Sequence, residues 1–215
     1  MRTDYSLYLV TNRDVLQGTA LPEAVEQAIL GGCTMVQLRE HDAPSAGFLR
    51  RALEVRRVTD RYGVPLIVNN RTDIALASGA AGVHVGQSDL PAAAVRRLIG
   101  KERILGVSVT TVEEALRAEA DGADYLGAGA IFPSRTKPDA KAVGIRTLQS
   151  ICEAVRLPVV AIGGIREDTV PLLPTGLAGV AVVSAVLARA DVRAAAERMR
   201  LCLARAGLRG GCRRG

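Results

Sequence analysis

Polar side chains at alternating positions follow an apolar run near residue 35. In QLREHD, residues 37–42, a period of two places Gln37, Arg39 and His41 on one face of a strand, with Leu38 and Glu40 on the other. An arginine facing a protein interior is costly unless it is paired. Its planar fork suits a phosphate or diphosphate group. The segment therefore indicates either an anion-binding strand end or an ion pair inside the protein.

Amide and carboxylate oxygens follow the next two apolar runs. Asn69 and Asn70 end PLIVNN, and Asp89 comes shortly after GVHVG. Mg²⁺ is commonly held by one or two carboxylates together with substrate phosphate oxygens. Asparagine and aspartate are also good caps for a following helix. Two interpretations stay open here, a polar metal pocket and ordinary helix caps, and His84 is expected to be a packed core histidine.

Small and hydroxyl-bearing residues mark the later runs. Ser108 ends GVS, where a hydroxyl suits a ligand site and a strand-end turn equally well. Gly163 and Gly164 follow one apolar run and Ser184 ends another. Glycine lets a backbone approach a ligand closely, although this pair could serve only a tight turn. Amides at these two strand ends would form a phosphate cradle.

A long polar loop interrupts GAGAIFPSRTKPDAKAVG, residues 127–144. It places Ser134, Thr136 and Lys137 after a strand of small residues. An ordinary connector would be shorter and would not need a cluster of phosphate-binding donors. We therefore expect the loop to place these side chains over one site formed by the strand ends. That site would hold a phosphate at the last two strands and further anionic groups near the second to fourth strands.

Short β-rich runs alternate with helical segments eight times along the chain. The predicted strands span residues 6–12, 35–40, 65–70, 82–86, 104–109, 125–130, 158–164 and 179–185. The predicted helices include 22–31, 45–61, 91–99, 113–121, 145–155 and 191–205. Such alternation with apolar strands predicts a parallel sheet. Eight units favour a single-domain (β/α)₈ TIM barrel over residues 1–204, and the alternative is a flavodoxin-like doubly wound sheet.

The composition limits the possible functions. The 215 residues are 48% hydrophobic and only 3% aromatic, so Val, Ile, Leu and Ala are expected to fill the core. Four arginines lie in residues 205–215, and removing these charges from the net +6 leaves +2 for the rest. The rest of the chain therefore lacks the strong positive charge that is typical of nucleic-acid-binding proteins. The tail, residues 205–215, is expected to be a solvated, disordered end.

The cysteines and the chain start indicate a cytoplasmic protein. The four cysteines are scattered without a C-x-x-C pair, so neither a disulfide framework nor a zinc site is expected. We identify no signal peptide and no apolar run of the roughly 20 residues that a membrane span requires. The sequence therefore predicts a soluble cytoplasmic protein that does not bind membranes, with homo-oligomer formation left open.

The ordered set of motifs resembles the thiamine phosphate synthase family. The motifs are QLRE (37–40), NNR (69–71), GVHVGQSD (82–89), GVS (106–108), GAIFPSRTK (129–137), AIGGI (161–165) and VVSA (182–185). The resemblance extends from residue 6 to about residue 203. The family joins 4-amino-5-hydroxymethyl-2-methylpyrimidine diphosphate to a thiazole phosphate, with Mg²⁺, through a dissociated pyrimidine methylene cation. The products are thiamine phosphate and pyrophosphate.

The resemblance also implies roles for individual residues. Arg39, Ser108 and Lys137 would be catalytic, and Asn70 and Asp89 would hold Mg²⁺. The implied substrate-binding residues are Gln37, Leu38, Arg39, Glu40, His41, Asn69, Ser108, Ser134, Arg135, Thr136, Lys137, Gly164, Val183 and Ser184. Within this set, the resemblance assigns the thiazole phosphate to Ser134, Thr136, Gly164, Val183 and Ser184.

Two positions depart from the family pattern and keep other functions open. The family usually has Lys where this chain has His41, and often Asp where it has Asn70. A related thiazole tautomerase would isomerise the thiazole alone, and a non-catalytic sensor would bind the intermediates without reaction. A barrel isomerase or aldolase would need a strand-end Lys or Glu, for which Lys137 is a poor candidate.

Overall fold

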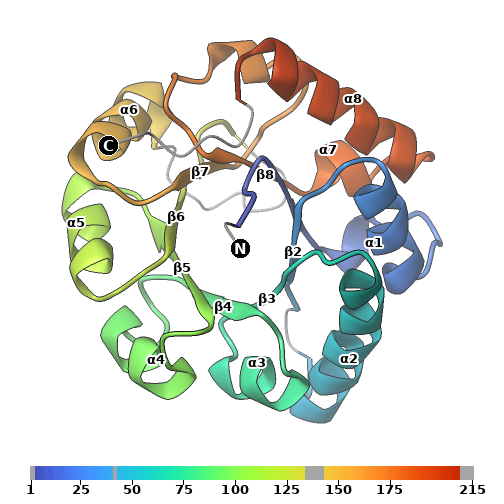
Figure 1. Ribbon diagram of the computed structural model, residues 1–215. Coiled ribbons are helices and arrows are strands. Elements are labelled where there is room, and N and C mark those ends of the chain that lie inside the picture. Colours follow the sequence, from blue (N-terminus) through green and yellow to red (C-terminus); the bar gives the residue numbers. More distant parts are fainter. Residues whose placement is uncertain (1–2, 41–42, 134–142, 209–215) are drawn as a thin grey trace.

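Eight parallel strands close into a barrel surrounded by helices in the computed structural model (Figure 1), which describes residues 3–40, 43–133 and 143–208. Each strand pairs with its neighbours in sequence, and β1 closes the ring against β8. The strands are β1 (Leu7–Val10), β2 (Met35–Leu38), β3 (Leu66–Asn69), β4 (Gly82–Val85), β5 (Ile104–Val109), β6 (Tyr125–Ala128), β7 (Val159–Ile162) and β8 (Gly179–Val182). The predicted (β/α)₈ barrel is confirmed, and the doubly wound alternative is wrong.

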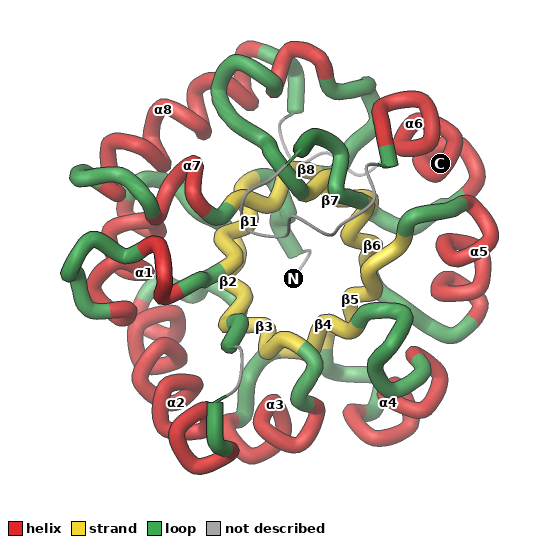
Figure 2. The backbone as a smooth tube through the Cα atoms, turned by 180° about the vertical axis from the view of Figure 1, so that it is seen from behind, coloured by secondary structure: helices red, strands yellow, loops and turns green. Residues whose placement is uncertain are grey.

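Helices follow the strands and form the outer ring, which Figure 2 shows from behind. The α-helices are α1 (Leu21–Leu30), α2 (Ser45–Arg61), α3 (Thr72–Ser78), α4 (Ala92–Ile99), α5 (Val112–Ala120), α6 (Gly144–Ala154), α7 (Ser184–Leu187) and α8 (Val192–Arg205). Two short 3₁₀ turns, η1 (Arg13–Val15) and η2 (Val170–Leu172), complete the described elements. The connection from β7 to β8 thus holds only a 3₁₀ turn, whereas β8 is followed by the short α7 and then by α8.

The packed part of the chain reaches past residue 204, where the sequence placed the end of the barrel. α8 runs to Arg205, and Leu208 is buried in the core between strands and helices. The amide of Leu208 also donates to the Leu203 carbonyl at 2.9 Å. Among the described residues, no helix is both long enough and apolar enough to cross a membrane.

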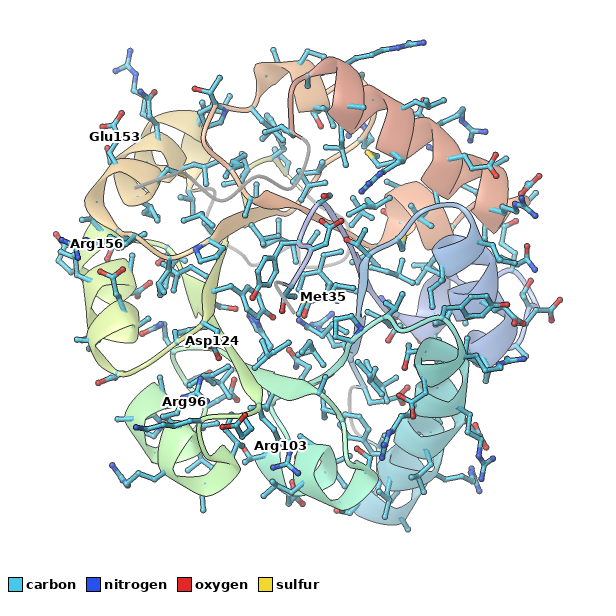
Figure 3. All side chains as sticks on the ribbon, in the orientation of Figure 1. Met35, Arg96, Arg103, Asp124, Glu153 and Arg156 are labelled. Carbon is cyan, nitrogen blue, oxygen red and sulfur yellow. The ribbon has the colours of Figure 1, made fainter. Side chains whose placement is uncertain are left out.

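The barrel interior contains most of the chain's tyrosines, which differs from the composition-based prediction. Tyr5, Tyr8 and Tyr125 are buried inside the ring, with Met35 near its centre (Figure 3). The Tyr125 ring lies 5.0 Å from the Tyr5 ring and 5.9 Å from the Tyr8 ring, centroid to centroid. An aliphatic core is thus largely correct for the layer under the helices, whereas the interior combines aliphatic side chains such as Ile67 and Val160 with the three tyrosines. Percentages of residue types carry no information on where a few large rings lie.

Candidate functional site

Because all strands of the closed barrel are parallel, their carboxyl ends meet at one end, which we call the mouth. The predicted site residues within the described ranges lie near the carboxyl ends of β2, β3, β4, β5, β7 and β8 or shortly after them, so they come from six different strands. They are Gln37, Leu38, Arg39, Glu40, Asn69, Asn70, Asp89, Ser108, Gly164, Val183 and Ser184. His41, Ser134, Arg135, Thr136 and Lys137 lie outside the described residues.

Arg39 is half-buried at the mouth and has no anionic partner in the described part of the chain. Its backbone amide donates to the Thr11 hydroxyl at 3.0 Å, which fixes the main chain beyond β2. No ion pair or hydrogen bond of its guanidinium is formed with the described residues. Burial alone lowers the pKa of Arg39 from its ordinary value. The internal salt bridge considered from the sequence is therefore absent there, and a ligand anion would supply the missing partner.

The neighbouring side chains of Leu38 and Glu40 face away from the interior, as the alternation predicted. Leu38 is fully buried in the layer beneath the helices. The Glu40 side chain is 1% exposed and lies 3.0 Å from both Arg13 Nε and Arg51 Nη2. These two arginines neutralise the carboxylate, so a ligand could approach Leu38 and Glu40 only through their main chain.

Asn70 and Asp89 do not cap the helices that follow them. Arg71 is the N-cap residue of α3 and Pro91 that of α4, and neither cap has a side-chain hydrogen bond. Asn70 instead adopts a left-handed backbone, with φ at 63°, and its amide donates to the His84 carbonyl at 2.8 Å. Asp89 Oδ2 accepts the Gly86 amide at 2.7 Å and closes its own turn. The helix-cap interpretation is wrong for both residues.

The oxygen donors at this part of the mouth suit a metal ion whose coordination is completed by oxygens of a bound substrate. No group of three His, Cys, Asp or Glu that could hold an ion occurs within the described ranges. Asp89 and Asn70 follow neighbouring strands, paired through Asn69 and His84, and they offer one carboxylate and one amide oxygen. Such hard oxygen donors fit Mg²⁺ when substrate phosphates provide further oxygens.

Ser108 is held from below by His84. His84 is a core histidine, 7% exposed, as the sequence predicted. Its Nε2 lies 2.8 Å from Ser108 Oγ, and its Nδ1 lies 2.8 Å from the Tyr125 hydroxyl. Gln87 Nε2 donates to the Ser108 carbonyl at 2.7 Å. Sequence reasoning missed Gln87 and Tyr125. For Tyr125 the one available signal was Gly106, because a glycine within a strand can mark a place where a large side chain packs closely.

Gln37 faces the interior, as the alternation predicted, but it lies below the mouth. Its Nε2 donates to the Tyr8 hydroxyl at 2.8 Å, and the side chain is buried. Gln37 is therefore engaged by the protein itself, and it is linked to the mouth through other side chains.

The ends of β7 and β8 combine tight packing with exposed polar groups. Gly163 and Gly164 both have positive φ, 98° and 65°. A Cβ at Gly164 would come within 2.6 Å of the Pro133 carbonyl oxygen, and the Phe132 amide donates to the Gly163 carbonyl. The two glycines thus allow the backbone of the loop after β6 to pack closely against the end of β7. This is a structural role in addition to any ligand contact. The side of the mouth at β8 is formed by half-buried Val183 and exposed Ser184.

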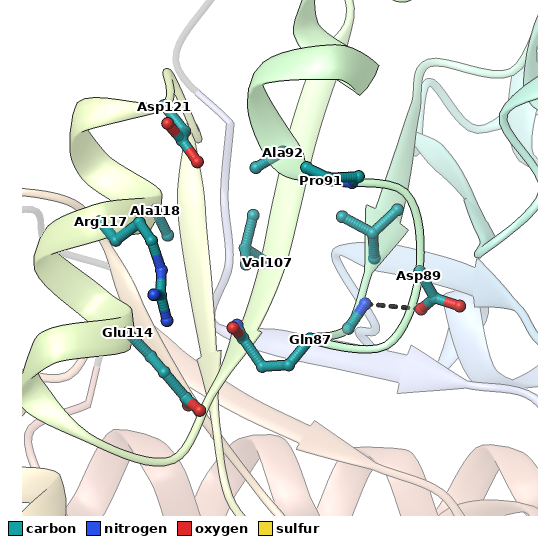
Figure 4. Close-up of a pocket in the computed structure, with 11 residues that line it drawn as sticks. Gln87, Asp89, Pro91, Ala92, Val107, Glu114, Arg117, Ala118 and Asp121 are labelled. Carbon is teal, nitrogen blue, oxygen red and sulfur yellow. Dashed lines mark hydrogen bonds between the residues drawn. The ribbon is translucent and has the colours of Figure 1, made fainter.

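A cavity of about 250 Å³ lies between α4 and α5, on the outer side of the barrel wall (Figure 4). The outward-facing Val85 and Val107 form its floor, and Arg117 comes from α5. Gln87 and Asp89 also border it, so the cavity and the mouth share one edge. The cavity nevertheless lies behind the wall that carries Ser108.

The closed barrel with polar groups from six strand ends defines a (β/α)₈-barrel enzyme whose site lies at the carboxyl ends of the strands. Residues 7–186 match the family described as thiamine monophosphate synthase. Thiamine-phosphate synthase of Ruminiclostridium cellulolyticum is 56% identical over 92% of this chain and 95% of its own length. That of Clostridium tetani is 52% identical, over 91% and 94%.

A solved structure supports the same relationship. Thiamine phosphate pyrophosphorylase from Pyrococcus furiosus superposes with a TM-score of 0.87 at 40% identity, covering 95% of this chain and 98% of its own. The chain belongs to the thiamine monophosphate synthase family. It is accordingly a transferase of thiamine biosynthesis.

Proposed function

We propose that the chain joins 4-amino-5-hydroxymethyl-2-methylpyrimidine diphosphate to thiazole phosphate, with Mg²⁺, to give thiamine phosphate and pyrophosphate. The observation that carries this proposal is the half-buried Arg39, whose guanidinium has no anionic partner among the described residues. A diphosphate matches the fork of such a guanidinium. The family relationship supports the same reaction.

The reaction needs no covalent nucleophile from the protein. The bond between the pyrimidine methylene carbon and the diphosphate oxygen breaks first, and the electron pair leaves with the diphosphate. The thiazole nitrogen then donates its lone pair to the methylene carbon and forms the new C–N bond. Asp89 and Asn70 would hold Mg²⁺. When bound, the ion would supply positive charge that stabilises the leaving diphosphate.

The remaining work belongs to the chain's own residues. Arg39 would neutralise the diphosphate, Ser108 would donate a hydrogen bond to it, and Lys137 would add a further positive charge. Asn69 and the other predicted contacts would orient the pyrimidine, whereas Gly164, Val183 and Ser184 would bind the thiazole phosphate. Holding both ligands at one mouth places the reacting atoms together and limits capture of the cation by water. A cytoplasmic location and homo-oligomer formation stay predictions.

Pyrophosphate release from the purified chain tests this function. We expect release only when both phosphorylated substrates and Mg²⁺ are present. Isomerisation of the thiazole substrate alone would indicate the tautomerase, and ligand binding without any reaction would indicate the sensor. An Asp89→Asn variant should lose most of the release, since the carboxylate at the metal site is removed.

A further inference from the structure

A continuous chain of hydrogen bonds crosses the barrel interior and ends at the mouth. It runs from Gln37 through Tyr8, Tyr125 and His84 to Ser108, and each link measures 2.8 Å between heavy atoms. The five residues come from β2, β1, β6, β4 and β5. We call this set the interior relay. All of its members are buried except Ser108, which lies partly exposed at the upper end.

The Gln37 end sets the direction of the relay. The Gln37 amide nitrogen can only donate, so the Tyr8 oxygen accepts from it. The Tyr8 hydrogen is then directed to Tyr125, the only other partner of its hydroxyl in the described chain. Since the Tyr125 oxygen accepts from Tyr8, its own hydrogen points to His84 Nδ1.

The same logic predicts the tautomer of a neutral His84 imidazole. When Nδ1 accepts from Tyr125, a neutral ring carries its hydrogen on Nε2. Nε2 therefore donates to Ser108 Oγ, 2.8 Å away. The Ser108 oxygen is then occupied as an acceptor, and its hydrogen is directed away from His84.

We propose that the interior relay orients Ser108 as a hydrogen-bond donor toward the mouth, with Gln37, Tyr8, Tyr125 and His84 as positioning residues. This inference rests on the proposed function, in which the ligand at Ser108 is a diphosphate. An anionic oxygen can only accept, so a hydroxyl whose hydrogen is free for the ligand binds it better than one that points inward.

The residues packed around the interior relay leave room for its rings and keep its phenols protonated. A Cβ at Gly106 would lie 2.2 Å from Tyr125 Cζ and 2.4 Å from His84 Nδ1, so only glycine leaves room for both rings. The same atom at Gly127 would lie 3.0 Å from His84 Cε1. Burial raises the pKa of both Tyr8 and Tyr125 above the ordinary value, which keeps the two phenols protonated and able to donate.

Nitrogen NMR of histidine tests the direction of the relay without any substrate. The chain has two histidines, His41 and His84, so ¹⁵N-labelled histidine gives two ring spectra, and a His41→Asn variant assigns them. At neutral pH we expect His84 to carry its hydrogen on Nε2 and to have an unprotonated Nδ1. Hydrogen on Nδ1 alone, or on both nitrogens, would overturn the proposal.

A tyrosine variant tests the consequence for binding. Tyr125→Phe removes one hydroxyl and should give a mixture of His84 tautomers together with about tenfold weaker binding of pyrophosphate with Mg²⁺. Tyr62→Phe is the matched control, because the Tyr62 hydroxyl is bound to Glu26 on the surface. In a Ser108→Ala background, Tyr125→Phe should cause no further loss, since both changes act through one hydroxyl.

The outcomes separate this proposal from the proposed function. Unchanged pyrophosphate binding in a folded Tyr125→Phe variant, or equal losses in the presence and absence of Ser108, would overturn the relay. If Tyr125→Phe does not fold, Tyr8→Phe replaces it, and the wild-type tautomer still decides the direction. A wild-type chain that binds pyrophosphate but releases none from the two substrates would refute the synthase reaction, whereas the His84 tautomer and the Tyr125→Phe loss decide the relay independently.

Discussion

At the scale of a single residue, Arg39 has an arrangement that should cost stability unless a ligand anion is bound. Its guanidinium is partly removed from water, and the described residues provide no anion to compensate. The adjacent Glu40 has the opposite arrangement, a buried carboxylate between two arginines. We infer that the Glu40 pairs hold the strand end in place, whereas Arg39 is left for a ligand.

Replacing Arg39 should therefore separate binding from stability. Arg39→Met should weaken pyrophosphate binding by about 30-fold, because a charge-assisted contact is lost, while the thermal midpoint stays equal or rises. Titration calorimetry and thermal unfolding measure the two effects. Arg39→Lys should restore little, since an ammonium lacks the planar fork. A less stable Arg39→Met protein with normal binding would show that Arg39 is structural.

Asn70 is the second residue whose chemistry can be tested alone. Asparagine accepts a left-handed backbone more readily than most residues, which suits its φ of 63°, but it gives Mg²⁺ a neutral oxygen. Asn70→Asp adds a carboxylate and should strengthen Mg²⁺-dependent pyrophosphate binding by about tenfold. Asp73→Asn serves as the control, because that carboxylate pairs with Arg71. No gain in the Asn70→Asp protein would remove Asn70 from the metal site.

At the scale of elements, the joint between α4 and β6 is stabilised by one arginine. Arg96 donates to the Gly122, Gly100 and Arg103 carbonyls and pairs with Asp124 (Figure 3). Asp124 in turn accepts the Leu105 amide at 2.7 Å. This arginine therefore connects the start of β5 with the start of β6, at the end of the barrel away from the mouth.

Loss of this joint should affect stability and leave the site intact. Arg96→Met should lower the free energy of unfolding by about 2 kcal/mol, since several carbonyl groups lose a charged donor. Arg97→Met, an exposed neighbour on the same helix, is the matched control. Denaturant unfolding gives both values. A loss of pyrophosphate affinity in a folded Arg96→Met protein would contradict the separation of the joint from the mouth.

Gly106 tests the packing between β5 and the interior relay. Gly106→Ala forces a methyl group into space held by Tyr125 and His84, and we expect a destabilisation of about 1–3 kcal/mol with a disturbed His84 tautomer. Gly47→Ala, in α2, should instead be neutral or slightly stabilising, because alanine favours helix and the nearest atoms belong to the flexible Arg51 side chain. Equal stability of the two variants would show that the β5 position is not crowded.

At the scale of the whole molecule, the sequence was sufficient for the fold and for the side of β2 that faces inward. Eight alternating units predicted the closed barrel, and the period of two placed Gln37 inside and Leu38 outside. These properties depend on local patterns that repeat along the chain. The family motifs likewise marked strand ends that meet at one mouth.

The interactions between strands could not be predicted in this way. Tyr8 and Tyr125 are 117 residues apart, and their contact depends on the barrel's closure and register. The pairing of Glu40 with Arg13 and Arg51 likewise depends on two other elements. Helix capping by Asn70 was wrong because the chain takes a left-handed step there, which the next residues do not signal. Convergence of distant side chains is a tertiary property.

The central claim is that the chain binds a diphosphate at the mouth of the barrel, where the carboxyl ends of β2 to β5 meet. A crystal structure of the protein with pyrophosphate and Mg²⁺ tests it most directly. We predict density for the diphosphate in contact with Arg39 and Ser108, with the metal between it and Asp89. Pyrophosphate found only elsewhere, for example in the cavity between α4 and α5, would contradict the account.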